Sequence, residues 1–489
     1  MRWIGLLVLL LTQIPFVTAQ TPDCVGLIAP LLNVGITGRV KPDDGIGLAL
    51  HSEANSSSTV IRTLPEGTGF LVISDATCRD GWVWWQVRLA DGQEGYLAEG
   101  NATTYFAEAF ALGVHLLIPD TANPNQINRV MIDPSGTPQP RPPLILSPQG
   151  GSAASLWQSF ELTAASTALA DRLANCADRV PAGLVDVESV PFDGSTRTYY
   201  PSPDGEQVLI FRDYLFDLPR CDGTGAQFGT TYVYVAAPQQ GERLIFPYSQ
   251  QSDPPPGQHC QPPTVAAADY ATHIEEVAWS QDGHYAALSV RYLRNSQFYP
   301  CAFYHIFVID TATLGVQYIG EGQRLGWYNG RLYYAHIERS DPNTPGVQRM
   351  FHVRPNGEDR LEIPLPAGIN VIGASLPYNA AGDRLLVCTD AACGQVAIWS
   401  LRNYSLGTAF APPINGTASF MAGDTQFLWL SAAGQVYQQG LADGSSEMLA
   451  TDTPVTAVHP GWMGAVLHLD DGQMIYLDQG GTLHAVEGG

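Results

Sequence analysis

Short apolar runs separated by turn residues fill most of the chain and predict an all-β protein. Between Gly35 and Tyr105 these runs alternate apolar and polar residues with the period of two that strands have. The most regular run, WVWWQVRL from Trp82 to Leu89, turns back through Asp91-Gly92, a pair typical of tight hairpins. This pattern predicts a small barrel over residues 34–106.

The same alternation divides the three tryptophans of this hairpin between two faces. Trp85 shares a face with Val87 and Leu89, which we expect to be core, whereas Trp82 and Trp84 lie on the opposite face, which we expect to be exposed. An exposed aromatic pair suits a sugar or peptide platform, and equally a surface against which the next domain docks. The alternative is that all three indoles fill a small core. The residues expected to bind a ligand are Trp82, Trp84 and Tyr96.

From Pro181 to the end, a repeated pattern of a turn glycine followed by an apolar strand predicts a β-propeller over residues 181–489. Two copies of the pattern begin with SPDG and SQDG, in which serine and aspartate side chains hydrogen-bond backbone amides while glycine takes a positive φ. After a long first interval the repeats are 38 to 52 residues apart, enough for four strands each. Six blades are expected, marked by Gly205, Gly283, Gly330, Gly382, Gly423 and Gly461.

Two stretches between the barrel and the propeller have a different composition. Residues 107–151 are rich in proline, glycine and asparagine, which predicts a partly extended linker. Residues 152–180 place apolar side chains near helical spacing, which predicts a short helical segment.

The N-terminus has the features of a secretory signal peptide over residues 1–19. Arg2 precedes an apolar run from Ile4 to Leu11, and Val17-Thr18-Ala19 supplies small residues for cleavage. The run is too short to span a bilayer comfortably, and no later stretch reaches the length that a span needs. We therefore expect a protein that is secreted or held at the cell surface, with no transmembrane segment.

Length and charge narrow the function classes. At 489 residues the chain is expected to form two or more domains. The formal net charge of -23 makes nucleic acid and anionic membranes poor partners. Lys41 is the only lysine, and it stands neither in a phosphate-binding Walker A loop nor in the setting of a Schiff-base lysine.

Export favours disulfides for the eight cysteines. We predict that Cys24 pairs with Cys78, tying the N-terminal arm to the barrel, and that Cys388 pairs with Cys393 across the mouth of a hairpin. The other four remain unassigned, with Cys221 to Cys260 or Cys301 as the weakest expectations. No C-x-x-C or H-E-x-x-H motif occurs and the histidines are scattered, so no metal and no cofactor are expected.

Several motifs in the barrel segment resemble the bacterial SH3 (SH3b) domain. They are VIRTLPEGT from Val60 to Thr68, WWQV from Trp84 to Val87, and GQEGY from Gly92 to Tyr96. The resemblance implies recognition of cell-wall material, although the segment GLALHSEANSSS lacks the N-x-R-x-G-P that most members carry in the loop that helps line the ligand groove. The SPDG and SQDG turns resemble TolB-like and WD40-like propeller repeats, and this likeness supports a fold and no particular activity.

No motif in the sequence identifies a catalytic centre. There is no G-x-S-x-G elbow, and the carboxylate pairs Glu275-Glu276 and Asp470-Asp471 point to opposite sides if they lie on strands, which makes them poor acid/base couples. We expect a secreted non-catalytic binding protein, whose barrel recognises cell-envelope peptide or glycan, or another secreted protein, and whose propeller is an interaction platform. The alternative is a secreted propeller hydrolase acting on glycans, with the barrel as its targeting device.

Overall fold

The computed structural model describes the following residues: 24, 26–41, 47–90, 92–110, 112–120, 122–123, 125–133, 136–146, 193–219, 225–238, 240–246, 270–294, 302–338, 346–372, 378–379, 382–420, 426–440, 445–461, 464–478 and 481–486. The expected signal peptide at 1–19 and helical segment at 152–180 lie outside them. Every regular element within them is a β-strand, which confirms the all-β prediction. None of these residues belongs to a helix long and apolar enough to cross a bilayer.

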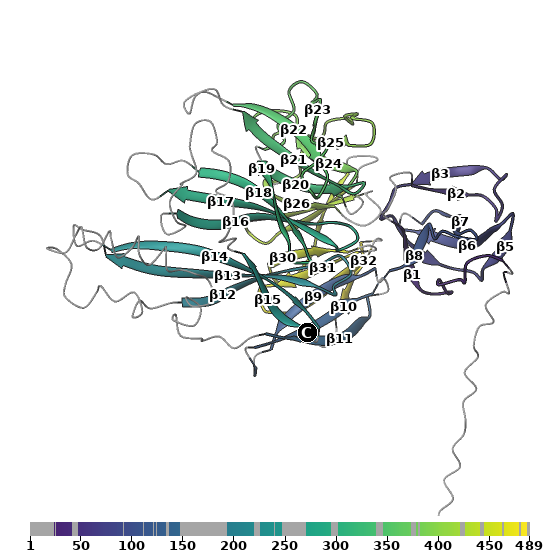
Figure 1. Ribbon diagram of the computed structural model, residues 1–489, viewed down its shortest axis with the longest axis horizontal. Helices are drawn as coiled ribbons and strands as arrows, with labels where there is room; N and C mark the ends of the chain where they lie inside the picture. Colours follow the sequence, from purple (N-terminus) through teal and green to yellow (C-terminus); the bar gives the residue numbers. More distant parts are fainter. Residues whose placement is uncertain are drawn as a thin grey trace, which may run out of the picture.

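The N-terminal strands form a small barrel (Figure 1). Its sheet order is β3-β2-β7-β6-β4-β1-β8, and β5 pairs with β6. Inward-facing apolar side chains from every strand except β5 fill its core, with Phe70 and Leu97 completely buried. The strands are β1 (Thr37–Val40), β2 (Leu48–His51), β3 (Val60–Leu64), β4 (Gly69–Val72), β5 (Thr77–Arg79), β6 (Trp82–Leu89), β7 (Glu94–Gly100) and β8 (Ala107–Ala109).

The arm that precedes β1 belongs to the barrel core. Leu32 is completely buried in it. Glu99 on β7, also completely buried, accepts hydrogen bonds from the backbone N–H groups of Leu31 (2.6 Å) and Leu32 (3.1 Å) and from Nε1 of Trp85 (2.6 Å). A buried carboxylate is stable only when such donors replace its hydration. Glu99 therefore ties the arm to the tryptophan hairpin.

The six blades predicted from Pro181 onward are confirmed. Blade 1 has β12 (Asp193–Pro201), β13 (Val208–Pro219), β14 (Gly225–Ala237) and β15 (Gly241–Phe246); blade 2 has β16 (Tyr270–Trp279), β17 (Tyr285–Arg294), β18 (Ala302–Asp310) and β19 (Val316–Glu321); blade 3 has β20 (Gln323–Tyr328), β21 (Arg331–Glu338), β22 (Val347–Val353) and β23 (Leu361–Ile363). Blade 4 has β24 (Arg384–Cys388) and β25 (Val396–Ser400), flanked by single bridges; blade 5 has β26 (Gly416–Phe420), β27 (Gln426–Ser431), β28 (Val436–Gly440) and β29 (Ser446–Leu449); blade 6 has β30 (Val455–Pro460), β31 (Gly464–Leu469), β32 (Met474–Asp478) and β33 (Leu483–Ala485).

The marker glycines fall at corresponding places in these blades. Gly205, Gly283 and Gly330 have φ values of 67°, 73° and 64° in the turns between the first and second strands of blades 1, 2 and 3. Gly382 (φ 72°) precedes β24, and Gly461 follows β30. Gly423 lies outside the described residues.

The segment expected to be a linker, residues 107–151, is instead mostly β-structure, and this expectation is wrong. It contains β8 and a three-stranded sheet of β9 (Val114–Pro119), β10 (Gln126–Ile132) and β11 (Pro138–Ile145), which we call the closing sheet. Four of the prolines in this segment, Pro138, Pro140, Pro142 and Pro143, lie on β11, an edge strand, where the missing N–H of proline is tolerated.

The closing sheet joins the first blade to the last. One of its faces packs through Ile127 and Leu144 against Val208 and Ile210 of blade 1. Its other face packs through Val114, Leu116 and Ile132 against Val466 and Tyr476 of blade 6. Figure 1 shows β9 and β10 between the teal strands of blade 1 and the yellow strands of blade 6. Five further apolar clusters join consecutive blades from blade 1 to blade 6, so the closing sheet completes the ring.

The SPDG turn of blade 1 has the geometry that its sequence predicts. The Ser202 hydroxyl bonds Asp204 Oδ1 (2.5 Å) and accepts from the N–H of Gln207 (2.9 Å), while Asp204 Oδ1 accepts from the N–H of Glu206 (3.0 Å). The SQDG turn of blade 2 repeats these contacts with Ser280 and Asp282 at 2.5 to 2.9 Å. The aspartates therefore stabilise the turns.

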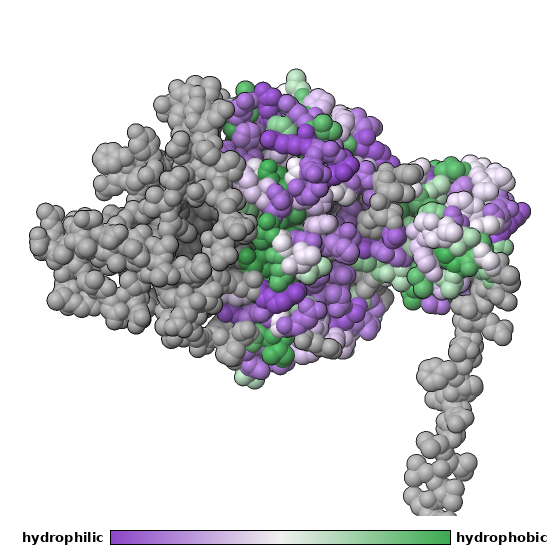
Figure 2. All heavy atoms as spheres, in the orientation of Figure 1, coloured by the Kyte–Doolittle hydropathy of each residue, from purple (hydrophilic) through white to green (hydrophobic). Residues whose placement is uncertain are grey.

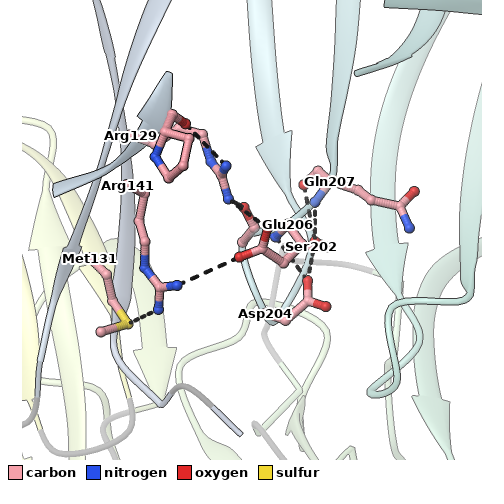
Figure 3. A network of polar contacts seen from close by, with 9 residues as sticks. Arg129, Met131, Arg141, Ser202, Asp204, Glu206 and Gln207 are labelled. Atoms are coloured by element: carbon pink, nitrogen blue, oxygen red, sulfur yellow. Dashed lines mark hydrogen bonds and ion pairs between the residues drawn. The ribbon is translucent and has the colours of Figure 1, made fainter. Parts of the chain in front are cut away.

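An arginine of the closing sheet holds the SPDG turn from outside (Figure 3). Arg129 on β10 is buried, donates to the carbonyl of Gly205 and lies 3.4 Å from the carboxylate of Glu206. Arg141 on β11 approaches the same carboxylate at 3.7 Å. Polar contacts thus reinforce the apolar seam between the closing sheet and blade 1.

Both predicted disulfides are present. Cys24 is bonded to Cys78 with a Cα–Cα distance of 5.8 Å, and Cys388 to Cys393 with one of 4.9 Å. The first joins the N-terminal arm to β5, and the second spans the turn between β24 and β25. The cysteines at 176, 221, 260 and 301 lie outside the described residues.

We expect the double substitution Cys24→Ser/Cys78→Ser to lower the free energy of unfolding by roughly 4 kcal/mol, because a bridge across 54 residues removes much freedom from the unfolded chain. The matched control, Cys388→Ser/Cys393→Ser, removes a bridge across 5 residues and should cost roughly 2 kcal/mol. Urea unfolding monitored by tryptophan fluorescence measures both values. Equal losses in the two variants would contradict the prediction.

Acid should destabilise the ring through His305 on β18. Burial lowers the pKa of this completely buried histidine to about 4 from an ordinary 6.5, and its Nδ1 lies 3.0 Å from the Tyr318 hydroxyl. Between about pH 6.5 and pH 4, His305 is therefore protonated in the unfolded chain but neutral in the folded chain. The contribution of neutral His305 to the free energy of unfolding is fully present above this pH range. It is lost as the pH falls through the range, by an amount on the order of 3 kcal/mol.

His305→Gln should flatten this part of the pH dependence, as measured by urea unfolding at pH 7 and pH 4.5. The exposed His284 offers the matched control, His284→Gln. The explanation fails if both variants keep the same acid sensitivity as the unsubstituted chain.

Candidate functional site: the aromatic face of the barrel

Strand β6 sends its side chains alternately to the two sides of the barrel sheet. Trp85, Val87 and Leu89 are buried in the core, as the alternation predicts. The indole N–H of Trp85 donates to Oε2 of the buried Glu99. The core therefore receives a large apolar side chain whose one polar atom is satisfied.

Trp84 lies on the opposite side, but the expectation that it is exposed is wrong: only 2% of it is accessible. The short strand β5 pairs with the start of β6, with Thr77 opposite Trp84, and Trp84 Nε1 donates to the carbonyl of Arg79 at 3.0 Å. The ring of His51 packs edge-on against the indole, with 5.2 Å between ring centroids. Alternation predicts the side that a residue takes, and here neighbouring strands cover that side.

Trp82 and Tyr96, the other two residues expected to bind a ligand, are partly exposed around Trp84. Trp82 lies 6.4 Å from Trp84 and 5.2 Å from Phe106, measured between ring centroids. Tyr96 is opposite His51 in the β2–β7 pair. The structure thus brings the three expected residues onto one side of the barrel. We call Trp82, Trp84, Tyr96, His51 and Phe106 the aromatic face.

Sequence reasoning missed His51 and Phe106. They lie about thirty residues before and twenty residues after the tryptophans, and only the pairing of β2 with β7 and the fold of the chain after β7 bring them alongside. Phe106 is partly exposed, whereas His51 is buried. Because that pairing depends on the closed barrel, no local pattern could have identified either residue.

The segment that departs from the usual SH3b loop contains β2, and its second half, residues 52–58, forms a polar loop beside this face. Asn55 is buried there, and its Oδ1 accepts hydrogen bonds from the backbone N–H (3.1 Å) and hydroxyl (2.9 Å) of Ser57. The Ser58 hydroxyl lies 3.2 Å from His51 Nδ1. Val60, which is 49% exposed, is opposite His51 in the β2–β3 pair and extends the apolar surface to the sheet edge.

The aromatic face is remote from the propeller. Strand β5, which pairs with the tryptophan end of β6, lies at the end of the barrel farthest from the ring (Figure 1). Two residues that contact the propeller, Arg39 and Gly67, come from β1 and from the turn before β4. In the space-filling view the barrel surface mixes apolar with polar residues, whereas the rim of the ring is mostly hydrophilic (Figure 2).

Of the carboxylate pair Glu275-Glu276 in the ring, Glu276 forms an ion pair with an arginine of the next blade. Arg324 of β20 pairs with Glu276 of β16 at 2.6 Å and donates to the carbonyl of Ile372 at 3.1 Å. The Tyr378 hydroxyl donates to the carbonyl of Arg324 at 3.1 Å, and burial raises the pKa of Tyr378, so its phenol keeps the proton that it donates. This network joins blades 2, 3 and 4. Glu275 is exposed beside it at a bulge in β16.

The second carboxylate pair lies in the hairpin turn between β31 and β32. Both Asp470 and Asp471 are exposed, and Asp471 Oδ1 accepts a hydrogen bond from the backbone N–H of Gln473 at 3.0 Å. Asp470 donates its own backbone N–H to the carbonyl of Pro454. Within the described ranges, no group of three or more His, Cys, Asp or Glu side chains could hold a metal ion.

Residues 46–102 match the family model of the bacterial SH3 domain. The match includes the VIRTLPEGT, WWQV and GQEGY motifs and four members of the aromatic face. The bacterial SH3 domain therefore accounts for the barrel from just before β2 to just beyond β7, while the N-terminal arm, β1 and β8 extend it. A search of the curated proteins finds no match to the chain.

Solved structures similar to this chain resemble it distantly. The dipeptidyl peptidase 4 of Porphyromonas gingivalis has a TM-score of 0.40 and 10% identity, over 77% of this chain and 58% of that one. The oligogalacturonate lyase of Vibrio parahaemolyticus has a TM-score of 0.36 and 9% identity, over 60% and 93%. The β-propeller domain of Cps50 (Swd1) from Myceliophteria thermophila has a TM-score of 0.34 and 12% identity, over 62% and 89%. Likeness at this level does not assign an activity.

Replacing the three tryptophans one at a time should separate core from surface. Trp85→Ala should lower the free energy of unfolding by about 3 to 5 kcal/mol, and Trp84→Ala by a similar amount, because both indoles are buried and hydrogen-bonded. Trp82→Ala should cost about 1 kcal/mol, because the side chain is already partly exposed. Chemical denaturation of the full chain measures all three. A negligible loss in Trp84→Ala would contradict the burial that the structure assigns to it.

Proposed function

We propose that this chain is a secreted, non-catalytic binding protein whose bacterial SH3 domain recognises peptide or glycan of the cell envelope at its aromatic face. The observation that carries the proposal is the grouping of Trp82, Tyr96 and Phe106, all partly exposed, around a buried floor on the side remote from the propeller. The family match over residues 46–102 supports the same ligand class.

The chemistry of the aromatic face suits such a ligand. Ring faces stack on the apolar C–H surface of a sugar or on the backbone of a short peptide, and they give large contact area at little entropic cost. Trp84 already uses its indole N–H internally, so it acts as the floor. Gln86, opposite Tyr96 across β6 and β7, offers a polar side chain at the edge of the rings.

The propeller supports this role as a rigid platform. Its seams are apolar from blade to blade, and the acidic chain repels nucleic acid and anionic membranes. The ring's partner would be another secreted protein, since propellers present broad surfaces built from loops. Export is consistent with the two disulfides, which persist in oxidising compartments.

Binding should depend on the exposed rings of the aromatic face. Trp82→Ala and Tyr96→Ala in the full chain should each weaken co-sedimentation with purified peptidoglycan at least tenfold, as expected when an aromatic contact residue is truncated. Val34→Ala, which shortens an exposed apolar side chain of the N-terminal arm, is the matched control. Melting temperatures should change little in Trp82→Ala and Tyr96→Ala.

Competition with soluble stem peptides and with glycan strands would distinguish the two ligand sources. Unchanged sedimentation of both aromatic variants would overturn the assignment of the site. Release of soluble sugar fragments by the purified chain would overturn the non-catalytic part of the proposal and favour a glycan hydrolase.

A further inference from the structure

The barrel meets the propeller through a buried arginine. Arg39 of β1 is only 6% exposed, and its guanidinium donates to the main-chain carbonyl of Gln281 in the SQDG turn of blade 2. The same group pairs with Glu108 of β8 at 2.6 Å and stacks 3.7 Å above the ring centre of Phe110. A guanidinium held on three sides in this way has a fixed position.

The side chain of Gln281 fills the space between the barrel and the ring. A Cβ atom added to Gly67 of the barrel would lie 3.1 Å from Cδ of Gln281, and one added to Gly382 before β24 would lie 3.2 Å from its Nε2. Gly67 belongs to the LPEGT motif, so a turn that identifies the domain in the sequence is also part of this contact. The SQDG turn thus touches the barrel and blade 4 at once.

A second charged group of the barrel lies beside blades 3 and 4. Glu66, next to Gly67, is only 4% exposed. Its charge acts on Tyr328 at the end of β20, as do the charges of Arg402 and Asp383 from blade 4, and Arg402 hydrogen-bonds the Tyr328 side chain. Arg402 lies 3.5 Å from Asp383. The LPEGT turn therefore places a buried carboxylate near the end of β20, where Arg402 of blade 4 also reaches.

We propose that the turn end of blades 2 to 4 is a docking surface whose partner is the chain's own barrel. Arg39 and the contact between Gly67 and Gln281 lock the two together, so the barrel and the ring form one rigid body. This joint uses the side of the barrel away from the aromatic face and keeps that face open and fixed in direction. The proposal holds whatever ligand the aromatic face binds.

The substitution Arg39→Gln in the full chain tests the joint, with Glu108→Gln as the matched control. Both remove the ion pair within the barrel, but only Arg39→Gln removes the donor to Gln281. Calorimetry of the unsubstituted chain and of Glu108→Gln should show the barrel and ring melting in one transition, whereas Arg39→Gln should show two. Amide exchange of residues 280–283 should be at least tenfold faster in Arg39→Gln, as expected for loss of a charge-assisted hydrogen bond.

Arg402→Gln changes a residue on the propeller side of the joint and leaves the barrel core unchanged. It therefore tests the proposal even if Arg39→Gln fails to fold. It should accelerate amide exchange of residues 64–68 while exchange in β6 and β7 stays unchanged. One shared transition and unchanged exchange in both variants would overturn the proposal. Equal effects of Arg39→Gln and Glu108→Gln would also overturn it, because the ion pair within the barrel would then explain the result.

Discussion

Closure of the ring is the constraint on which the rest of the structure depends. A propeller blade buries both faces only when a neighbour covers each of them, so the first and last blades need a partner between them. The closing sheet supplies it by packing Ile127 and Leu144 on blade 1 and Val114 and Leu116 on blade 6. The contacts with blade 6 join residues more than three hundred positions apart in sequence, which makes closure the most non-local event in the fold.

Closure also determines where the barrel stands. Only a few residues separate β8 of the barrel from β9 of the closing sheet, so the barrel must lie next to the end of the ring that carries the blade turns. Arg39 then reaches the SQDG turn of blade 2, much as Arg129 reaches the SPDG turn of blade 1. Both arginines donate to a backbone carbonyl of such a turn. Serine and aspartate side chains already bind the amides of these turns, which leaves the carbonyl oxygens free to accept from a guanidinium.

The buried carboxylate of Glu99 has the corresponding role inside the barrel. By accepting hydrogen bonds from the arm and from Trp85, it brings together segments nearly seventy residues apart and lets a large indole enter a small core. With Trp85 inward, Trp84 and Trp82 must take the other side. There β5 and His51 cover Trp84 and leave Trp82 and Tyr96 partly exposed. The surface available to a ligand is therefore what remains after the barrel has satisfied its own core.

The sequence by itself determined the local parts of this protein: strands, hairpin turns, the marker turns within the described residues, the Cys388–Cys393 bridge and the side of β6 on which each tryptophan lies. Each follows from periodicity or from the φ preferences and hydrogen-bonding groups of a few adjacent residues. Only the tertiary structure decided that the proline-rich segment closes the ring, that Trp84 is buried, that His51 and Phe106 join the aromatic face, and that Arg39 holds the barrel to blade 2. The reason is the same in each case: burial and partnership depend on which distant strand lies alongside, and that is set by ring closure and barrel pairing, which leave no mark on the pattern of neighbouring residues.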